Sequence, residues 1–201
     1  VLKKELEKPG YAPETLAIGT NTDPYQPIER RRRITRNVLK VLSTFNHPTA
    51  IITKSQLILR DLDILASMAE RSLISVGISV TTLDRHLSRI MEPRAPTPKR
   101  RLETVRRLAG ANVPVTVMLA PIIPPINDQE IETIIAAAAE AGAHAADYIL
   151  LRLPGEVKGL FREWLITHYP DRAKKVLSLI AKHREGKLYS SDWFKRMRGE
   201  G

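Results

Sequence analysis

The sequence predicts an α/β protein built on a parallel sheet, either open or closed into a partial barrel. Short aliphatic and β-branched runs without polar alternation indicate strands buried on both faces. Helical patterns separate these runs, and the strands recur at roughly 30- to 40-residue intervals, the scale of a βαβ unit. Alternating strands and helices form parallel sheets. The predicted strands are residues 16–18, 49–53, 74–80, 113–119 and 148–153.

The first two predicted helices are amphipathic. One begins in the Arg30–Arg33 run, and the second has Asp61 as its N-cap residue. In both, apolar side chains recur at spacings of three and four residues and so lie on one face. These side chains are Ile34, Val38, Val41, Leu42 and Phe45 in the first helix, and Ile64, Leu65 and Met68 in the second.

Three further helices are predicted in the second half of the chain. Pro98 lies in the first turn of the third helix. Asp128 is expected to cap the fourth helix, which ends near Gly142. The fifth surrounds residues 161–165. Their apolar positions are Leu102, Val105 and Leu108, then Ile131, Ile134, Ile135 and Ala138, then Phe161, Trp164 and Leu165.

The composition limits the class of protein. A chain of 201 residues that is 43% hydrophobic can form one sizeable domain. No window approaches the roughly 20 apolar residues of a membrane helix. With no secretory pattern either, we expect a cytoplasmic protein without a membrane partner. The lack of cysteine excludes disulfides and cysteinyl metal sites within these residues.

The chain is strongly basic, with 32 Lys and Arg against 22 Asp and Glu and a net charge of +10. This charge favours an anionic partner such as nucleic acid or a phosphorylated ligand, although basic proteins without such partners are common. We expect residues 1–181 to form the barrel and residues 182–201 a basic C-terminal extension. Within that extension, residues 192–198 are either a packing helix or a contact segment.

Ligands of parallel α/β folds bind at the carboxyl ends of the strands, and polar residues follow the first predicted strand there. Gly19 permits close backbone approach. Hydroxyl, amide and carboxylate groups come next in a single turn. The turn is either the floor of a ligand site or a hydrogen-bonded turn ahead of Pro24. Its side chains are those of Thr20, Asn21, Thr22 and Asp23.

Cations and one hydroxyl mark the next strand ends. Lys54 is a Schiff-base nucleophile, a fixed cation for an anionic ligand, or a surface lysine. Ser79, inside an apolar strand, needs a partner, either a carbonyl group or a ligand. Cations at 99–101 oppose the dipole of the helix that they open, and an anion would relieve this. The proline-rich loop 120–128 either lines one side of a flat ring or simply connects a strand to a helix.

Several familiar sites are missing from the sequence. The five histidines show no metal-ligand spacing, and there is no P-loop, dinucleotide fingerprint or nucleophile elbow. Hydroxyls, an amide, a lysine and arginines remain around the predicted cavity. These groups suit a zwitterionic or anionic small ligand.

Six stretches of the sequence, in this order, resemble a bacterial radical S-adenosylmethionine family, the DNA-repair-photolyase-like proteins related to spore photoproduct lyase. The resemblance spans most of residues 10–200 and depends on the order and spacing of the stretches rather than on one motif. The stretches are GTNTDPYQPIER, IITKSQLILRDLDIL, GISVTTLD, MEPRAPTPKRRLE, APIIPPIND and LLRLPGEVKGLF.

The resemblance implies a partial (β/α)6 TIM-like barrel. In the family, the first strand leads into a C-x3-C-x2-C loop that holds a [4Fe–4S] cluster, which binds S-adenosylmethionine and generates a 5′-deoxyadenosyl radical. That strand and loop have no counterpart in this sequence, so the first strand predicted here corresponds to the family's second. We therefore expect the cluster ligands to lie outside this chain, which would be a segment of a longer protein.

The resemblance also implies roles for residues in the turn after the first strand. Thr22 would approach the amino-acid end of S-adenosylmethionine, and Asp23 would bind substrate or the amino group. Thr20 occupies the position of the hydrogen-donating cysteine of spore photoproduct lyase. Because a threonine hydroxyl is a poor hydrogen-atom donor, thymine-dimer repair by that thiol route is not expected.

Further contacts with the cofactor are implied at the later strand ends. Lys54 would balance the carboxylate charge, and Ser79 would hydrogen-bond the carboxylate or the ribose. Arg94 or Arg101 would add a second cation, and Pro121–Ile123 would lie where the adenine is held. No catalytic or metal-binding residue is predicted. The predicted cofactor-binding set is Thr20, Asn21, Thr22, Asp23, Lys54, Ser79, Arg94, Arg101, Pro121 and Ile123.

The resemblance thus implies the core of a lyase-like radical S-adenosylmethionine enzyme, inactive as this segment alone. Its substrate is unknown, with nucleic acid as a candidate, and its electron donor would be a protein such as flavodoxin or ferredoxin. Two alternatives stay open from the residues themselves. One is a cluster-free β/α-barrel lyase or aldolase that uses Lys54. The other is a basic module that binds nucleic acid without chemistry.

Overall fold

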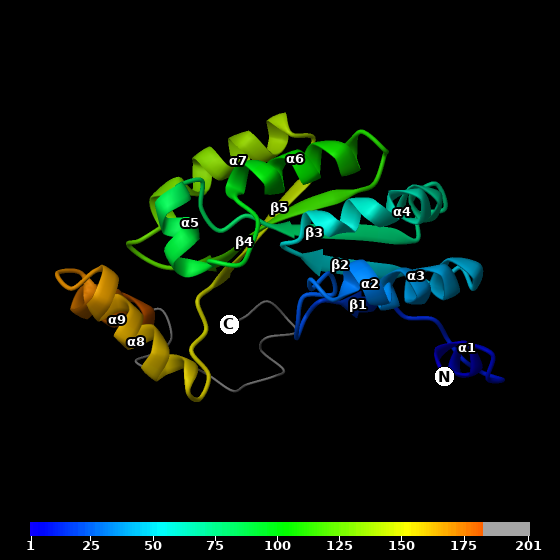
Figure 1. Cartoon of the computed structure of the whole chain (residues 1–201), viewed down its shortest axis with the longest axis horizontal. Helices are drawn as coiled ribbons and strands as arrows, with labels where there is room; N and C mark the ends of the chain where they lie inside the picture. Colours follow the sequence, from blue (N-terminus) through cyan, green and yellow to red (C-terminus); the bar gives the residue numbers. More distant parts are fainter. Residues whose placement is uncertain (183–201) are drawn as a thin grey trace. The chain divides into compact units, whose positions relative to one another are not determined.

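A computed structural model describes residues 1–182 and shows one five-stranded sheet with helices between the strands (Figure 1). The strands follow one another in the order β1-β2-β3-β4-β5, and the parallel register places Ile18 opposite Ile51 and Ile51 opposite Val76. The predicted α/β fold, with parallel strands of a partial TIM-like barrel, is confirmed. The strands are β1 (Leu16–Ile18), β2 (Thr49–Thr53), β3 (Ile74–Ser79), β4 (Val115–Ile122) and β5 (Ala145–Leu150).

The first three strands lie where the apolar runs predict them, and the last two are displaced. β5 begins three residues before its apolar run, because backbone pairing is already established by the His144 N–H, which donates to the Val115 carbonyl at 3.0 Å. β4 continues past its run to Ile122, whose carbonyl accepts from the Leu151 N–H at 2.9 Å. Hydrogen bonding between strands, rather than hydrophobicity, sets these bounds.

The prediction that every strand is buried on both faces holds for the middle of the sheet and is wrong at its edges. Ile51, Ile78 and Val117 are fully buried in β2, β3 and β4. In β1, Leu16 is 38% exposed, and in β5 Tyr148 is 65% exposed. Both strands stand at an edge, where a strand has a neighbour on one side only.

The helices confirm the predicted alternation and add elements that the apolar pattern did not indicate. α6 begins with Pro98, and α7 is followed by Gly142 in a left-handed conformation, as expected. The short helices α1, α5 and the C-terminal α9 were not predicted. The helices are α1 (Leu2–Leu6), α2 (Glu29–Arg32), α3 (Ile34–Thr44), η1 (Gln56–Asp61), α4 (Leu62–Ala69), α5 (Arg85–Met91), α6 (Pro98–Ala109), η2 (Asp128–Glu130), α7 (Ile131–Glu140), α8 (Val157–His168) and α9 (Ala173–Lys182).

The helix predicted to begin in the arginine run is interrupted at Arg33, whose φ of 52° breaks it into α2 and α3. The buried Glu29 carboxylate holds this break. It accepts hydrogen bonds from the backbone N–H groups of Ile34 at 3.0 Å and Thr35 at 3.1 Å. These are first-turn donors of α3, which have no partner within the helix. A glutamate from the preceding helix therefore takes the place of the usual N-cap side chain.

Two predicted helix caps are corrected by the structure. Asp61 takes the N-cap position of α4, but its carboxylate makes no capping hydrogen bond. It is fully buried and instead pairs with Arg36 at 3.0 Å and with Arg60 at 2.7 Å. Asp128 does not cap α7, which begins at Ile131; it opens η2. In the first case, the charged partners outcompete the backbone for the carboxylate.

The chain forms two compact units. The first comprises residues 1–119 and 132–147, and the second comprises residues 120–131 and the chain from residue 148. In the first, α4 and α6 both contact β3, and α3 contacts α4 (Figure 1). Their fully buried side chains include Leu39, Leu42, Leu65, Val105 and Leu108. In the second, α8 and α9 contact one another and bury Leu165, Val176 and Ile180.

Two sequence expectations concern features beyond this fold. None of the helices within residues 1–182 has the length and apolar character needed to cross a membrane. The predicted basic extension, including residues 192–198, lies outside the described residues except for Lys182, so the expected domain boundary stays a prediction.

Gly19 is the position where β1 ends and the chain turns across the sheet edge. Its φ is +100°, and a Cβ placed on it would lie 2.0 Å from the Ile52 carbonyl oxygen and 3.1 Å from Pro24 Cδ. Only glycine fits both restrictions. The close approach expected at this glycine is therefore made by the backbone of β2.

We predict that Gly19→Ala lowers the free energy of unfolding by about 3 kcal/mol or more, because left-handed strain and a clash with backbone add together. Gly10→Ala is the matched control. Gly10 has a φ of +81° but no atom within 4 Å of a built Cβ, so its cost is that of strain alone, about 1–2 kcal/mol. Urea unfolding followed by circular dichroism measures both. Equal losses would show that the clash is relieved by movement of β2.

Candidate functional site

The carboxylate of Asp23 fastens the turn after β1 to the end of β2. Its Oδ1 accepts from the Thr53 hydroxyl at 2.7 Å and from the Tyr25 N–H at 2.8 Å. Its Oδ2 accepts from the Lys54 N–H at 2.9 Å. A carboxylate accepts about four hydrogen bonds, so three of its sites are filled by the protein. Asp23 thereby sets where the backbone of Lys54 lies.

The side chain of Lys54 points to Glu92, a residue between α5 and α6. Lys54 Nζ forms an ion pair with Glu92 Oε1, and Arg101 Nη2 donates to Glu92 Oε2 at 2.5 Å. The Glu92 side chain is 12% exposed, that of Lys54 37% and that of Arg101 2%. One carboxylate thus lies between two cations, one buried and one partly open to solvent.

Arg101 uses its whole guanidinium on protein acceptors. Besides the bond to Glu92, Nη1 donates to the Ser79 carbonyl at 3.0 Å and Nε donates to the Pro96 carbonyl at 2.8 Å. Arg101 therefore connects the carboxyl end of β3 to the loop that leads into α6. The anion expected to compensate the cations at the start of this helix is supplied, for Arg101, by Glu92.

Opposing influences act on the ionisation of Glu92. Burial raises the pKa of this carboxyl, but the charges of Arg101 and Lys54 and the hydrogen bonds from both outweigh it, so the pKa is held below its usual value. Glu92 is therefore ionised at neutral pH. The three groups together carry one net positive charge.

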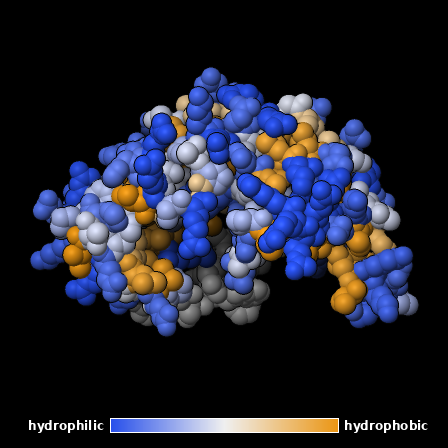
Figure 2. Space-filling model, in the orientation of Figure 1, coloured by the Kyte–Doolittle hydropathy of each residue, from blue (hydrophilic) through white to orange (hydrophobic). Residues whose placement is uncertain are grey.

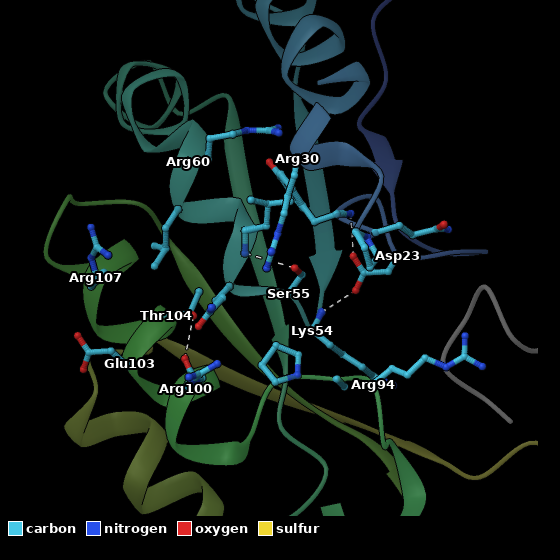
Figure 3. A pocket seen from close by; sticks show the side chains of 18 residues that line it. Asp23, Arg30, Lys54, Ser55, Arg60, Arg94, Arg100, Glu103, Thr104 and Arg107 are labelled. Carbon is cyan, nitrogen blue, oxygen red and sulfur yellow. Dashed lines mark hydrogen bonds between the residues drawn. The ribbon is translucent and has the colours of Figure 1, made fainter. Parts of the chain in front are cut away.

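A cavity of about 770 Å³ opens beside this cluster (Figure 3). Three of the predicted site residues, Asp23, Lys54 and Arg94, line it. Arg30 from α2 extends into it in Figure 3, and α6 lines its other side. The described residues that line it are Asp23, Tyr25, Gln26, Pro27, Arg30, Lys54, Ser55, Gln56, Leu57, Leu59, Arg60, Arg94, Ala95, Pro96, Arg100, Glu103, Thr104 and Arg107.

The other predicted residues are not part of this lining. Thr20, Asn21 and Thr22 are exposed in the turn after β1. Ser79 is buried and contacts Arg101 through its carbonyl group. Parallel pairing thus brings Lys54 and Ser79 to neighbouring strand ends, and Arg101 reaches the same place from α6.

Pro121 and Ile123 belong to the second unit, where Asn127 holds their loop. The Asn127 side chain donates to the Pro121 carbonyl at 3.0 Å and accepts from the Ile123 N–H at 2.6 Å. Asn127 and Ile123 are both almost fully buried. Their predicted contact with an adenine ring stays a prediction.

An iron–sulfur cluster does not fit the residues of this chain. The sequence has no cysteine among its 201 residues. Within residues 1–182, no group of three or more His, Cys, Asp or Glu side chains is arranged to hold a metal ion. The donor set at the strand ends consists of cations, hydroxyls and carboxylates that are already engaged.

The sequence was compared with models of known protein families. The model described as the radical SAM superfamily matches residues 2–138. The chain belongs to the radical S-adenosylmethionine superfamily. The predicted family membership is therefore confirmed, and the strand-end cluster can be considered as part of a radical S-adenosylmethionine barrel.

Curated relatives of this radical S-adenosylmethionine chain are themselves uncharacterized. It is 34% identical over 187 residues to the Mycobacterium tuberculosis protein Rv2578c, covering 92% of this chain and 53% of that protein. It is 29% identical over 126 residues to protein MJ0683 of Methanocaldococcus jannaschii, covering 63% of this chain and 47% of that protein. The chain spans about half the length of these relatives.

Solved structures similar to this chain share its fold. A spore photoproduct lyase variant has a TM-score of 0.61 at 15% identity, covering 84% of this chain and 49% of the lyase. SuiB of Streptococcus suis has a TM-score of 0.53 at 15% identity, covering 77% of this chain and 37% of SuiB. At these sequence identities, the similarity shows a shared fold, and the roles of individual residues are not transferred from it.

Glu92 and Asn127 are the site residues that sequence reasoning missed. Glu92 lies in the stretch Met91–Arg94, which interrupts the helical pattern beside several cations. A single acidic residue close to Arg94 and to the cations at 99–101 is the sequence pattern that indicates an ion pair at Glu92. Asn127 precedes Asp128 in a proline-rich loop, where an amide is a common holder of backbone turns.

We predict that Glu92→Gln lowers the free energy of unfolding by about 3 kcal/mol at pH 7, because it leaves the buried Arg101 charge without its counter-ion. The folded-state pKa of Glu92 is lowered, so its stabilisation is complete above the usual carboxyl value of 4.5 and is lost as the pH falls through the folded-state pKa. The difference between wild type and variant should therefore shrink below about pH 4.5.

Glu103→Gln is the control for this substitution. Glu103 pairs with Arg106 at 2.7 Å, but both side chains are more than half exposed, so the loss should stay below about 1 kcal/mol. Unfolding curves for the three proteins between pH 3 and 8 give the comparison. A difference for Glu92→Gln that is unchanged at acid pH would contradict an ionised Glu92.

Proposed function

We propose that this chain binds S-adenosylmethionine at the carboxyl ends of its strands, as part of a radical S-adenosylmethionine enzyme. The single observation that supports this most is that Lys54 and Arg101 both pair with Glu92, while Arg101 also donates to the Ser79 carbonyl, beside the carboxyl ends of β2 and β3. The arrangement is held by buried contacts and leaves one cation, Lys54, partly open to solvent. A preorganised cation suits the carboxylate of an amino acid.

In this proposal, Lys54 and Arg94 bind the carboxylate of S-adenosylmethionine. Arg94 is exposed and lines the same cavity as Lys54. Arg101 acts differently from the sequence expectation, as a positioning residue that holds Glu92 and the end of β3. Asp23 likewise positions Lys54 through its backbone, while one lone-pair site stays available for the ligand's amino group.

The remaining sequence-based contacts are proposed separately for each unit. Thr20, Asn21 and Thr22 offer hydroxyl and amide groups from an exposed turn, and the Ser79 hydroxyl is proposed for the carboxylate or ribose. Pro121 and Ile123, in the second unit, are proposed for the adenine. S-adenosylmethionine supplies the 5′-deoxyadenosyl group. The residues of this chain bind and orient it and exclude water.

The Schiff-base alternative is weakened by the contacts of Lys54. Its ammonium group lies in an ion pair with Glu92, whereas a nucleophilic lysine needs an uncharged amine. Such lysines are usually desolvated or placed beside another cation without a shared carboxylate. The site therefore fits a binding cation better than a covalent nucleophile.

The substrate is not set by the fold. One similar structure is spore photoproduct lyase with bound AdoMet and a dinucleoside spore photoproduct, and another is SuiB with its precursor peptide SuiA. One barrel architecture thus accompanies a nucleic-acid lesion in one protein and a peptide in another. We propose a nucleic-acid substrate for this chain from its charge, and a lyase-like reaction driven by an electron donor such as flavodoxin or ferredoxin.

We predict that Lys54→Met weakens binding of S-adenosylmethionine to this chain by about 10- to 100-fold, the loss of one charge-assisted hydrogen bond. Equilibrium dialysis with radiolabelled S-adenosylmethionine measures the affinity. Lys40→Met, at an exposed lysine of α3, is the matched control and should leave the affinity unchanged. Equal weakening by both variants, or none by Lys54→Met, would remove Lys54 from the binding site.

The radical reaction is tested on a protein that carries this sequence together with the proposed cluster loop. After anaerobic reconstitution with iron and sulfide, we expect reductive cleavage of S-adenosylmethionine to 5′-deoxyadenosine. The 201 residues alone should release none, because they have no cysteine for the cluster. Such a protein with neither a cluster spectrum nor 5′-deoxyadenosine would refute the enzymatic proposal, while the binding test above stands by itself.

A further inference from the structure

The cavity beside Lys54 has a large excess of positive charge. Six cationic and two acidic side chains line it. Both acids are engaged, since Asp23 accepts three hydrogen bonds and Glu103 pairs with Arg106. Two cations are also paired, Lys54 with Glu92 and Arg60 with Asp61. The four other arginines form no ion pair within residues 1–182: Arg30, Arg94, Arg100 and Arg107.

S-adenosylmethionine does not account for these arginines. It carries a sulfonium and an ammonium group against one carboxylate, so its net charge at neutral pH is positive. Its carboxylate needs Lys54 and at most one further cation. At least three arginines would then remain uncompensated in one cavity, and this mutual repulsion is unfavourable without an anionic partner.

The spacing of the arginines requires a ligand with several anionic groups. Arg100 and Arg107 lie two turns apart on one face of α6, about 10 Å along its axis. Arg30 enters from α2, and Arg94 comes from the loop between α5 and α6 (Figure 3). A single phosphate cannot contact all of these guanidinium groups. A chain of phosphates can, and guanidinium groups bind phosphate oxygens in pairs.

Among the described residues, the lining offers cations but no surface for base stacking. Its one aromatic side chain within residues 1–182 is Tyr25, which is 2% exposed. The exposed arginines at positions 31–33 continue the positive charge beyond the cavity, where hydrophilic side chains gather over α2 (Figure 2). The volume of about 770 Å³ is that of a small-molecule pocket and admits a few nucleotides of one strand.

We propose that this arginine cavity binds consecutive phosphates of a single nucleic-acid strand. The inference rests on the proposed function in one respect, since it names the partner of an S-adenosylmethionine-binding core. It assigns Arg30, Arg94, Arg100 and Arg107 to the strand backbone. It places that strand beside Lys54, the proposed contact of S-adenosylmethionine.

The test is fluorescence anisotropy of a labelled twelve-nucleotide oligo(dT) with the 201-residue chain, measured without S-adenosylmethionine between 50 and 200 mM salt. Each phosphate contact contributes about −0.7 to the slope of log affinity against log salt for a single strand. Combining Arg30→Gln, Arg100→Gln and Arg107→Gln should therefore make the slope shallower by about 2. Arg94 is kept because it is also proposed for the cofactor.

A charge-matched variant controls for the overall basic charge. Arg162→Gln, Lys174→Gln and Lys175→Gln together remove three exposed charges from α8 and α9. The salt slope of this variant should differ from that of the unaltered chain by less than about 0.7, the contribution of one phosphate contact. Equal changes in the two variants, or no binding by the unaltered chain at 50 mM salt, would overturn the assignment. Circular dichroism establishes that both variants are folded.

Two further measurements separate the strand from other anions and from the proposed function. Oligo(U) should bind within about threefold of oligo(dT), because both present the same phosphates. Inorganic triphosphate should compete only weakly with the oligonucleotide. If it binds as tightly as the oligonucleotide does, the ligand of the cavity is a small polyphosphate instead. The triple-arginine variant should keep its affinity for S-adenosylmethionine. If the chain binds oligonucleotide through the arginines but not S-adenosylmethionine, the proposed function fails and this inference stands.

Discussion

The contact between the buried Arg101 guanidinium and Glu92 is the interaction on which the rest of the site depends. Arg101 reaches the end of β3, the loop before α6 and the Glu92 carboxylate with three separate nitrogen atoms. Transferring a charged group from water to the protein interior is costly, so the Arg101 guanidinium is stable there only with all these acceptors in place. Glu92, once held, fixes Lys54 at the end of β2. Two strand ends and one helix start are thus connected by two ion pairs that share Glu92 and by two hydrogen bonds from Arg101.

Much of the fold follows from the hydrophobic pattern, but this pattern does not indicate whether a strand lies in the middle or at the edge of the sheet. The run Leu16–Ile18 is apolar throughout and Thr49–Thr53 has a threonine at each end, yet the first forms an exposed edge strand and the second a largely buried one. Neighbours in space decide that difference, and they are not encoded in a single run. The break at Arg33 is similar, since it depends on a carboxylate four residues earlier that reaches forward to cap α3.

The site could be predicted in part because parallel strands bring their carboxyl ends together. That rule places Lys54 and Ser79 in one region, which Arg101 enters from α6. It does not give the direction of side chains, and Arg101, expected to face a ligand, is turned to the protein. The prediction that Asp61 caps α4 fails in a similar way. Its carboxylate pairs with Arg36 from α3 and with the neighbouring Arg60 instead of with the helix end. Charged side chains choose partners across the tertiary structure, which local spacing does not reveal.

The chain therefore holds its charges in two different ways. Around Glu92, cations are paired, buried and fixed, which suits a small ligand that must be oriented accurately. In the cavity alongside, four arginines are exposed and unpaired within the described residues, which suits a flexible polyanion that adapts to them. Under the two proposals, a fixed site for the cofactor next to an adaptable site for phosphates suits one reaction on strands of varied sequence. Within the described residues, the one aromatic of the lining, Tyr25, is buried, so the proposed contacts are with the phosphates of the strand rather than with stacked bases.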